Sequence, residues 1–271
     1  MLRAFLKTFQ EIVYVERLSA SNGVLQRIDP RMKLFSTMAF ILSAVAVRTV
    51  TPLTILFAAI VALCIASKIP VKFFFLRTTI FVPIFAAVIA LPLPFITPGV
   101  PLAKFEYGGL VAGVTMEGIH RATQFVLKVW VSVASLILLV LTTRFSRLVH
   151  AMEKFKLPGV LVTMTAVTYR FIFLFVNESY RMALAKESRT VERERWREAL
   201  RSLANMIATL FIRAYERGER VYLSMIARGY AGKVRLLGDM ECATRDWVFA
   251  SVSMLICLMV LSTECLHLGG W

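Results

Sequence analysis

The sequence predicts an all-α integral membrane protein with about five transmembrane helices and a cytoplasmic helical region. Hydrophobic residues make up 58% of the 271 residues and charged residues only 18%, whereas an average soluble domain is nearer half apolar and a quarter charged. The mean hydropathy is +0.70, and 32 Lys and Arg stand against 17 Asp and Glu. An apolar body with a basic surplus is typical of a membrane protein with a positive cytoplasmic face. Apolar runs such as 34–47 exclude a nucleic-acid-binding protein.

Four regions are expected along the chain. Residues 1–28 are predicted to be an N-terminal amphipathic segment, because apolar residues from Leu2 to Val13 share one helical face beside Arg3 and Lys7. The other regions are transmembrane helices 1–4 over 29–142, cytoplasmic or interfacial helices over 143–243, and a C-terminal transmembrane helix over 244–271.

The first transmembrane helix has a recognisable start. Asp29 is expected to be its N-cap and Pro30 to occupy its first helical position, with Arg31 next. Its apolar run, 32–47, and the next, 53–67, are short for the roughly twenty residues that a span needs. Tilt of these helices or local thinning of the bilayer is therefore expected.

The third apolar run, 73–95, contains three prolines and is expected to bend at them. Residues 96–109 are rich in Pro and Gly and are predicted to form a loop. The prolines of the third run are Pro83, Pro92 and Pro94, and the fourth and fifth apolar runs are 125–141 and 247–266.

Basic residues orient the helices with the N-terminus in the cytoplasm. They concentrate before the first helix, after the second and after the fourth, and positively charged loops stay on the cytoplasmic side. The apolar stretch 160–176 has basic segments on both sides. It also contains Arg170, which would cost about 2.5–3.5 kcal/mol at the bilayer centre. We therefore expect 160–176 to stay at the cytoplasmic boundary or to enter the membrane only partly.

Residues 177–243 are the expected functional region, because basic residues are densest there. The sequence pattern predicts a helix over 177–196 and an amphipathic helix over 198–217. Gly218 is expected to interrupt this helix, and residues 219–232 are expected to form a short helix that ends at a glycine. Most of the arginines in this region are interpreted as a solvated surface or one that faces lipid headgroups.

Two arginines differ from the others in their neighbours. They lie in the tripeptides Ser188-Arg189-Thr190 and Ala227-Arg228-Gly229. Small neighbours let an arginine enter a groove, where its planar guanidinium can bind a carboxylate through two parallel hydrogen bonds. Two such arginines suit the docking of two partner subunits.

At these tripeptides the sequence resembles the transmembrane T component of energy-coupling factor (ECF) transporters, the EcfT/CbiQ family. Ala227-Arg228-Gly229 is similar to the second of two family motifs with arginine between small residues, and Ser188-Arg189-Thr190 resembles the first. Thr190 departs from the Gly, Ser or Ala that is usual there. Arg27-Ile28-Asp29-Pro30-Arg31 resembles the start of the family's first span, and Tyr169-Arg170-Phe171 favours the cobalt/nickel branch. The resemblance covers about residues 20–265.

The resemblance implies a non-catalytic transport subunit of the cell membrane that needs no cofactor and holds no metal. Two cytoplasmic ATP-binding subunits (A components) would bind Arg189 and Arg228, and a membrane substrate-capture subunit (S component) would rest on the apolar faces of 160–176 and 200–211. ATP hydrolysis would then move the capture subunit. The resemblance to the cobalt/nickel branch makes cobalt or nickel the expected substrate, with a vitamin as the alternative. Because the capture subunit holds the cargo in this family, no residue of this chain is expected to distinguish them.

Two other classes of protein are weighed against this one. An enzyme would need a nucleophile, a base or metal ligands that come together. The three histidines, His120, His150 and His267, lie far apart in the sequence, and the chain has no P-loop, HExxH or GxSxG motif. A membrane lipid enzyme stays open as an alternative. A self-sufficient channel or carrier usually has acidic residues within its spans. The cores of these spans are nearly free of Asp and Glu, and the only charges within the spans are expected to be arginines near their ends.

Overall fold

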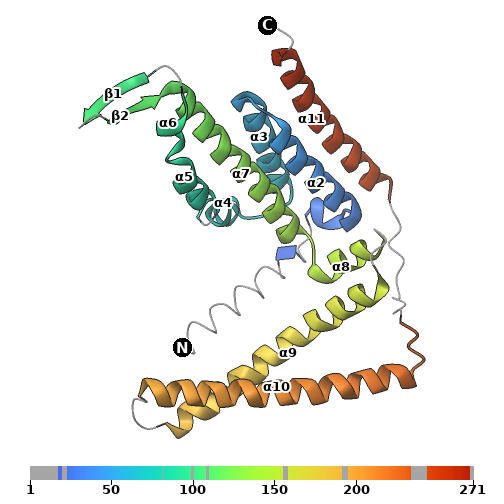
Figure 1. Cartoon of the computed structure of the whole chain (residues 1–271). Helices are drawn as coiled ribbons and strands as arrows, with labels where there is room; N and C mark the ends of the chain where they lie inside the picture. The colour runs from blue at the N-terminus through green and yellow to red at the C-terminus, as the bar shows by residue number, and fades with distance from the viewer. Residues whose placement is uncertain are drawn as a thin grey trace. The chain divides into compact units, whose positions relative to one another are not determined.

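The computed structural model describes residues 18–19, 23–80, 82–98, 101–107, 110–154, 158–190, 195–232 and 243–268. Most of the predicted amphipathic segment 1–28 lies outside these residues. The chain divides into two compact units, whose elements are labelled in Figure 1. One unit runs from the short helix η1 (Leu25–Arg27) to α7 (Met116–Thr142) and includes α11 (Thr244–Leu268). The other contains α8 (Phe145–Lys154), α9 (Gly159–Arg189) and α10 (Trp196–Ala227).

The first two long helices, α2 (Pro30–Ala46) and α3 (Val50–Ala66), have 17 residues each. The predicted N-cap of α2 is confirmed, because the Asp29 side chain accepts a hydrogen bond from the backbone N–H of Arg31 at 2.9 Å. Pro30 is the first helical residue, where its missing N–H is no loss. At 1.5 Å per residue each helix is about 25 Å long, somewhat less than the roughly 30 Å hydrocarbon core of a bilayer.

The third apolar run forms three helices, α4 (Val71–Thr79), α5 (Val82–Ala90) and α6 (Leu93–Ile96). Pro83 lies in the first turn of α5, and Pro92 is the N-cap of α6, with Pro94 in its first turn. A proline is tolerated at a helix start but breaks the hydrogen-bond pattern of a preceding turn. The predicted bending of this run is confirmed and takes the form of breaks.

The predicted loop over 96–109 is wrong in part. Strand β1 (Pro101–Tyr107) pairs antiparallel with β2 (Leu110–Thr115), and Tyr107 lies opposite Leu110. The two residues between the strands are Gly108 and Gly109, a type of pair that favours two-residue hairpin turns. Helix α7 follows at once from Met116, nine residues before the predicted start of the fourth span. The described chain is otherwise helical.

Helix α7 is the centre of its unit and contacts α2, α3, α4, α5 and α6, while α11 packs against α2 and α3 (Figure 1). Small residues let α2 and α11 approach closely, and the Ser36 and Ser253 hydroxyls share a hydrogen bond of 2.7 Å. The core of this unit includes Phe40, Ala44, Leu53, Leu56, Ile60, Phe74, Val131, Ala134, Leu138, Leu141, Cys257 and Val260.

The expectation that the spans hold only arginines near their ends is wrong. Glu264 is 6% exposed in α11, and Lys33 is 3% exposed in α2. The Lys33 ammonium donates hydrogen bonds to the Thr142 carbonyl oxygen at 3.0 Å and to Thr143 Oγ1 at 2.8 Å. A buried charge is tolerated when it is hydrogen-bonded in this way.

Four helical segments among the described residues are long and apolar enough to cross a membrane: Val71–Ile96, Met116–Thr142, Gly159–Arg189 and Thr244–Glu264. Val50–Ala66 is a shorter apolar helix. The chain is thus a multi-pass helical membrane protein, as its composition predicted. The prediction that 160–176 stays at the cytoplasmic boundary is untested, because length and apolarity alone also permit this segment to span.

In the second unit, α8 folds against α9, and the rings of Phe145 and Tyr169 stack with centroids 4.4 Å apart. Two predicted helix boundaries are wrong here. The helix expected over 177–196 ends at Arg189, and Gly218 lies inside a continuous α10. Glycine in a helix interior costs only about 1 kcal/mol relative to alanine, which does not break a helix of 32 residues.

Candidate functional site

The two predicted coupling arginines lie at the carboxyl ends of the two longest helices. Arg189 is the last residue of α9, with Thr190 as the C-cap. Arg228 is the C-cap of α10, directly after Ala227. The backbone carbonyls at a helix end have no partner within the helix, so the end carries partial negative charge and favours a cation.

At the end of α9 the small side chains bond to their own helix. The Thr190 hydroxyl donates to the Lys186 carbonyl oxygen at 2.9 Å, and the Ser188 hydroxyl donates to the Ala185 carbonyl oxygen at 3.0 Å. These hydroxyls therefore satisfy carbonyls near the helix end. Arg189 itself is exposed, so its guanidinium is the group that this end offers to a partner.

The end of α10 is a Schellman motif. The N–H of Tyr230 donates to the Met225 carbonyl at 3.0 Å, and the N–H of Gly229 donates to the Ile226 carbonyl at 2.9 Å. Gly229 has φ +82°, a left-handed conformation that side chains disfavour. The predicted glycine end of this helix is confirmed, and the tight turn fixes the backbone on both sides of Arg228.

Helices α9 and α10 contact each other, and an ion pair between Glu178 and Arg213 joins them. Arg189 follows Glu178 by about three turns of α9, roughly 16 Å, and Arg228 follows Arg213 by about four turns of α10, roughly 22 Å. The two helices cross, and their arginine ends lie at opposite ends of the pair (Figure 1). A single pocket cannot reach both.

Both arginines are exposed. Within the part of the chain that the structure describes, neither side chain has a hydrogen bond or ion pair. Each guanidinium is thus available to a carboxylate of another protein. In the same described residues, no three His, Cys, Asp or Glu side chains gather as metal-ion ligands.

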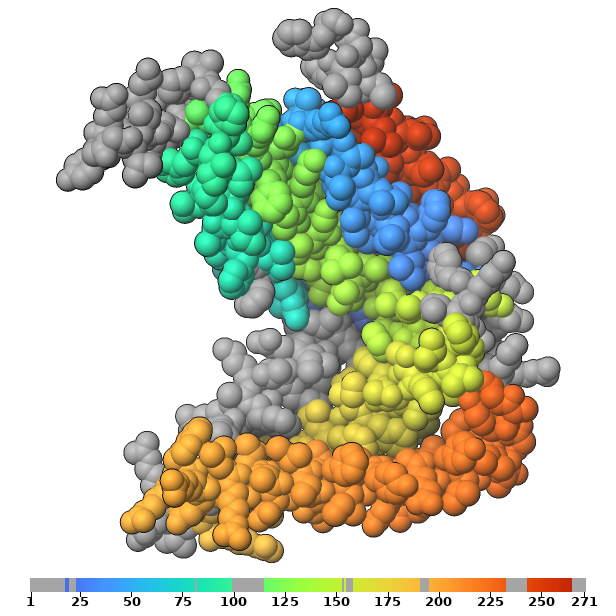
Figure 2. All heavy atoms as spheres, in the orientation of Figure 1, coloured from blue at the N-terminus to red at the C-terminus, as the bar shows by residue number. Residues whose placement is uncertain are grey.

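Helix α10 also presents an apolar face. Its residues 202–212 carry no charge, and Phe211 is 70% exposed. Figure 2 shows the side chains of α10, in orange, at the surface along the helix. The large exposed apolar residues of α10 are Trp196, Leu200, Leu203, Ile207, Phe211, Ile212, Tyr215, Tyr222, Leu223 and Ile226.

Sequence reasoning did not single out Arg213, which joins α10 to α9. A signal for it exists, because Arg213 is the first charge after the uncharged stretch 202–212. Its partner Glu178 lies 35 positions earlier, and helical periodicity relates only residues within a few turns of each other. The pairing therefore could not be read from spacing.

Comparison with known proteins agrees with this architecture. Residues 21–237 match the family model of CbiQ, described as a cobalt transport protein. The chain is 30% identical to the cobalt transport protein CbiQ of Rhodobacter capsulatus over 64% of this chain and 70% of that protein. It is 29% identical to the energy-coupling factor transporter transmembrane protein EcfT of Listeria innocua over 93% of this chain and 96% of that protein.

A third relative is an uncharacterised protein of Methanocaldococcus jannaschii, 30% identical over 94% of this chain and 88% of that protein. The family match covers most of the chain and includes both arginine tripeptides. The Listeria and Methanocaldococcus relatives align with this chain over nearly the full length. The chain therefore belongs to the CbiQ/EcfT family and is a membrane transport component of the energy-coupling factor type.

Proposed function

We propose that this chain is the T component that joins two cytoplasmic ATP-binding subunits to a membrane substrate-capture subunit. In this proposal the second unit, α8 to α10, faces the cytoplasm and transmits movement between them. The N-terminus lies on the same side. The single observation that carries the proposal is the placement of two exposed arginines at opposite ends of the crossed helices α9 and α10.

Each arginine would bind one ATP-binding subunit. The planar guanidinium of Arg189 or Arg228 binds a carboxylate through two parallel hydrogen bonds. The arginines lie on the order of 40 Å apart, because they lie roughly 16 Å and 22 Å from the Glu178–Arg213 pair in opposite directions. That separation supports two subunits, each with one groove, rather than one subunit that binds both.

The crossing gives this arrangement a means of transmitting movement. A subunit that displaces the Arg228 end of α10 acts on a rigid helix held to α9 by Arg213 and Glu178. When ATP binding and hydrolysis close and open the pair of ATP-binding subunits, the two arginine ends would move toward and away from each other. The displacement would reach the uncharged stretch 202–212 of α10.

The apolar faces of 200–211 and 160–176 would support the substrate-capture subunit. Contiguous exposed apolar surface marks interaction sites, and Ile207 and Phe211 are at least 60% exposed. For the cargo we propose cobalt or nickel, because relatives of this chain carry the name cobalt transport protein. A vitamin is the second candidate, and the capture subunit rather than this chain would distinguish them.

The test is co-purification of the ATP-binding subunits with the membrane complex, together with cobalt uptake by cells. Arg228→Ala is expected to release an ATP-binding subunit and abolish uptake, because truncating a hydrogen-bonded interfacial arginine costs about 2–5 kcal/mol. Arg189→Ala is expected to act in the same way. Arg220→Ala is the matched control, since Arg220 is an exposed arginine on α10 away from its end, and it should retain both properties.

Normal co-purification and uptake in the Arg228→Ala protein would overturn the proposal. Equal losses in the Arg220→Ala protein would overturn the specific role of the helix ends. Transport by the purified chain alone in liposomes would instead favour a self-sufficient carrier.

A further inference from the structure

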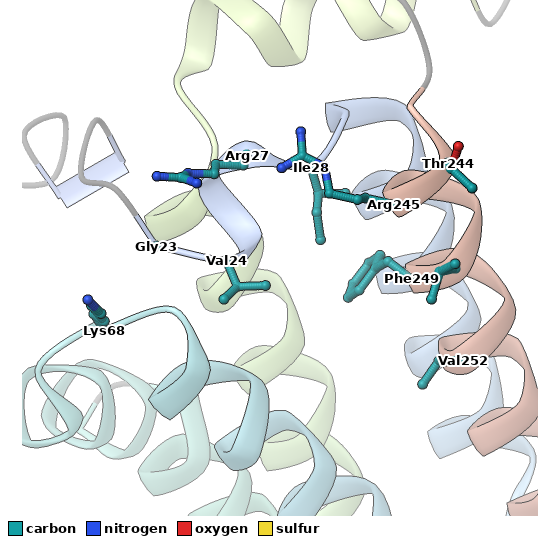
Figure 3. A pocket seen from close by; sticks show the side chains of 10 residues that line it. Gly23, Val24, Arg27, Ile28, Lys68, Thr244, Arg245, Phe249 and Val252 are labelled. Atoms are coloured by element: carbon teal, nitrogen blue, oxygen red, sulfur yellow. The ribbon is translucent and has the colours of Figure 1, made fainter.

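A cavity of about 670 Å³ lies among η1, the turn after α3 and the first turns of α11. Figure 3 shows Arg27 and Arg245 at one edge of it and Lys68 on the α3 side, with Val24, Phe249 and Val252 between the surrounding helices. The lining therefore combines an apolar wall with three cations.

Among the described residues, no carboxylate lines the cavity beside these three cations. Arg27, Lys68 and Arg245 are exposed, and none of them has an ion pair with another described residue. Asp29 and Asp246 follow Arg27 and Arg245 closely in sequence, but both are buried and neither lines the cavity. Three positive charges around one opening favour an anionic ligand.

Lys68 has φ 56°. This left-handed conformation is uncommon for a residue with a side chain. A glycine would fit there without strain, so lysine at this turn places a charge at the cavity where the backbone does not favour it. Such strain, where observed, is a reason to look for function.

Two hydrogen bonds fix the walls of the cavity. Gln26 Nε2 donates to the Ser67 carbonyl oxygen at 3.2 Å, which joins η1 to the turn that carries Lys68. The N–H of Asp29 donates to Asp246 Oδ1 at 3.0 Å, which joins the start of α2 to the start of α11. Gly23 contributes close packing, because a Cβ there would collide with the Ser67 carbonyl oxygen. The three cations are thus held on a preformed frame.

The cavity lies where α2 and α11 begin and α3 ends, which is the level at which membrane helices meet the lipid headgroups. We propose that it binds an anionic phospholipid. The headgroup phosphate would lie between Arg27, Lys68 and Arg245, and an acyl chain would lie along Phe249 and Val252 of α11. Basic pockets between membrane helices suit such headgroups, and this site is independent of the coupling arginines.

The test is native mass spectrometry of the full chain in detergent, titrated with phosphatidylglycerol or with phosphatidylcholine of the same acyl chains. We expect one phosphatidylglycerol to bind at least tenfold more tightly than phosphatidylcholine. The double variant Arg27→Gln/Arg245→Gln should lose this preference, since each cation near an anionic lipid contributes attraction. Arg197→Gln/Arg201→Gln removes the same charge from α10 and should keep it.

A second variant tests the apolar wall without a change of charge. Val252→Trp would fill the space beside Phe249 and should weaken phosphatidylglycerol binding by about tenfold. Equal binding of the two lipids, an equal loss in the α10 control, or unchanged binding in Val252→Trp would each overturn the proposal. Displacement of the lipid by inorganic phosphate at the same concentration would show a soluble-anion site instead, which also overturns it.

Discussion

Charged residues in the membrane helices of this protein serve as partners for helix ends. Glu264 Oε1 accepts from the backbone N–H of Arg48 at 2.7 Å, and its Oε2 accepts from the Thr49 hydroxyl at 2.7 Å, at the start of α3. The Lys128 ammonium donates to the Val45 carbonyl oxygen at 2.9 Å, at the end of α2. An anion thus meets a helix N-terminus and a cation meets a helix C-terminus, as the helix dipole favours.

We predict that Glu264→Ala destabilises the protein by about 1–3 kcal/mol, because it leaves donors of the α2–α3 turn without an acceptor. Glu264→Gln keeps one acceptor oxygen and should cost less. The measurement is thermal unfolding in detergent. Ser262→Ala is the control, since the Ser262 hydroxyl is exposed and donates only within α11, to Met259. A loss from Ser262→Ala as large as that from Glu264→Ala would contradict the capping role.

Single residues were predictable where their partners are local. Asp29 and Pro30 were identified as a helix start because an N-cap acts within its own first turn, and Asp29 bonds Arg31 two positions away. Glu264 and Lys128 bond residues that are 216 and 83 positions away. No spacing rule connects such distant positions, so these roles appear only in the folded chain.

Helix boundaries, like the roles of single residues, were predictable where their physical cause lies in the residue itself. Glycine was expected both to interrupt the helix at Gly218 and to end the short helix that follows. Of Gly218 and Gly229, only Gly229 has a positive φ. A Cβ at Gly218 would meet nothing within 4 Å, so this glycine is one weak position in a long helix. The bending of 73–95 at its prolines was predicted correctly, because a proline lacks the backbone N–H that a helix needs and so interrupts the helix at its own position.

We predict opposite effects of alanine at the two glycines. Gly229→Ala forces a side chain into a left-handed conformation at a cost of about 1–2 kcal/mol, whereas Gly218→Ala should stabilise α10 by about 0.5–1 kcal/mol. Hydrogen–deuterium exchange at Met225–Tyr230 measures this. The Gly229 variant should exchange there at least fivefold faster, and the Gly218 variant should not. Equal exchange in both variants would show that the Schellman turn does not hold the Arg228 end.

At the scale of the whole molecule, the unit that carries the two proposed coupling arginines is inserted in the sequence between α7 and α11. The chain leaves the helical bundle after α7 and returns to it in α11, which closes the bundle against α2 and α3. Buried hydrogen bonds secure this return, from Asp29 to Asp246 and from Ser36 to Ser253. The inserted region was recognisable from its basic residues, whereas the closure by α11 depends on contacts that composition does not reveal.

The side of the membrane on which this unit lies decides the proposed function, and labelling can determine it. In a chain with all four cysteines replaced by alanine, Met152→Cys in α8 and Tyr230→Cys after α10 should react with a membrane-impermeant maleimide only after the cells are permeabilised. Thr51→Cys, at the start of α3, should react in intact cells. Both expectations follow from the basic flanks, which stay in the cytoplasm.

Labelling of Met152→Cys and Tyr230→Cys also tests whether α9 crosses the membrane. Because α9 is long and apolar enough to span, a crossing α9 would put Met152 and Tyr230 on opposite sides, and only one would be protected. Protection of both means that α9 stays at the cytoplasmic boundary, where Arg170 avoids the bilayer centre. Reaction of Tyr230→Cys in intact cells would place Arg228 outside the cell, beyond the reach of any ATP-binding subunit, and the proposed coupling would be wrong.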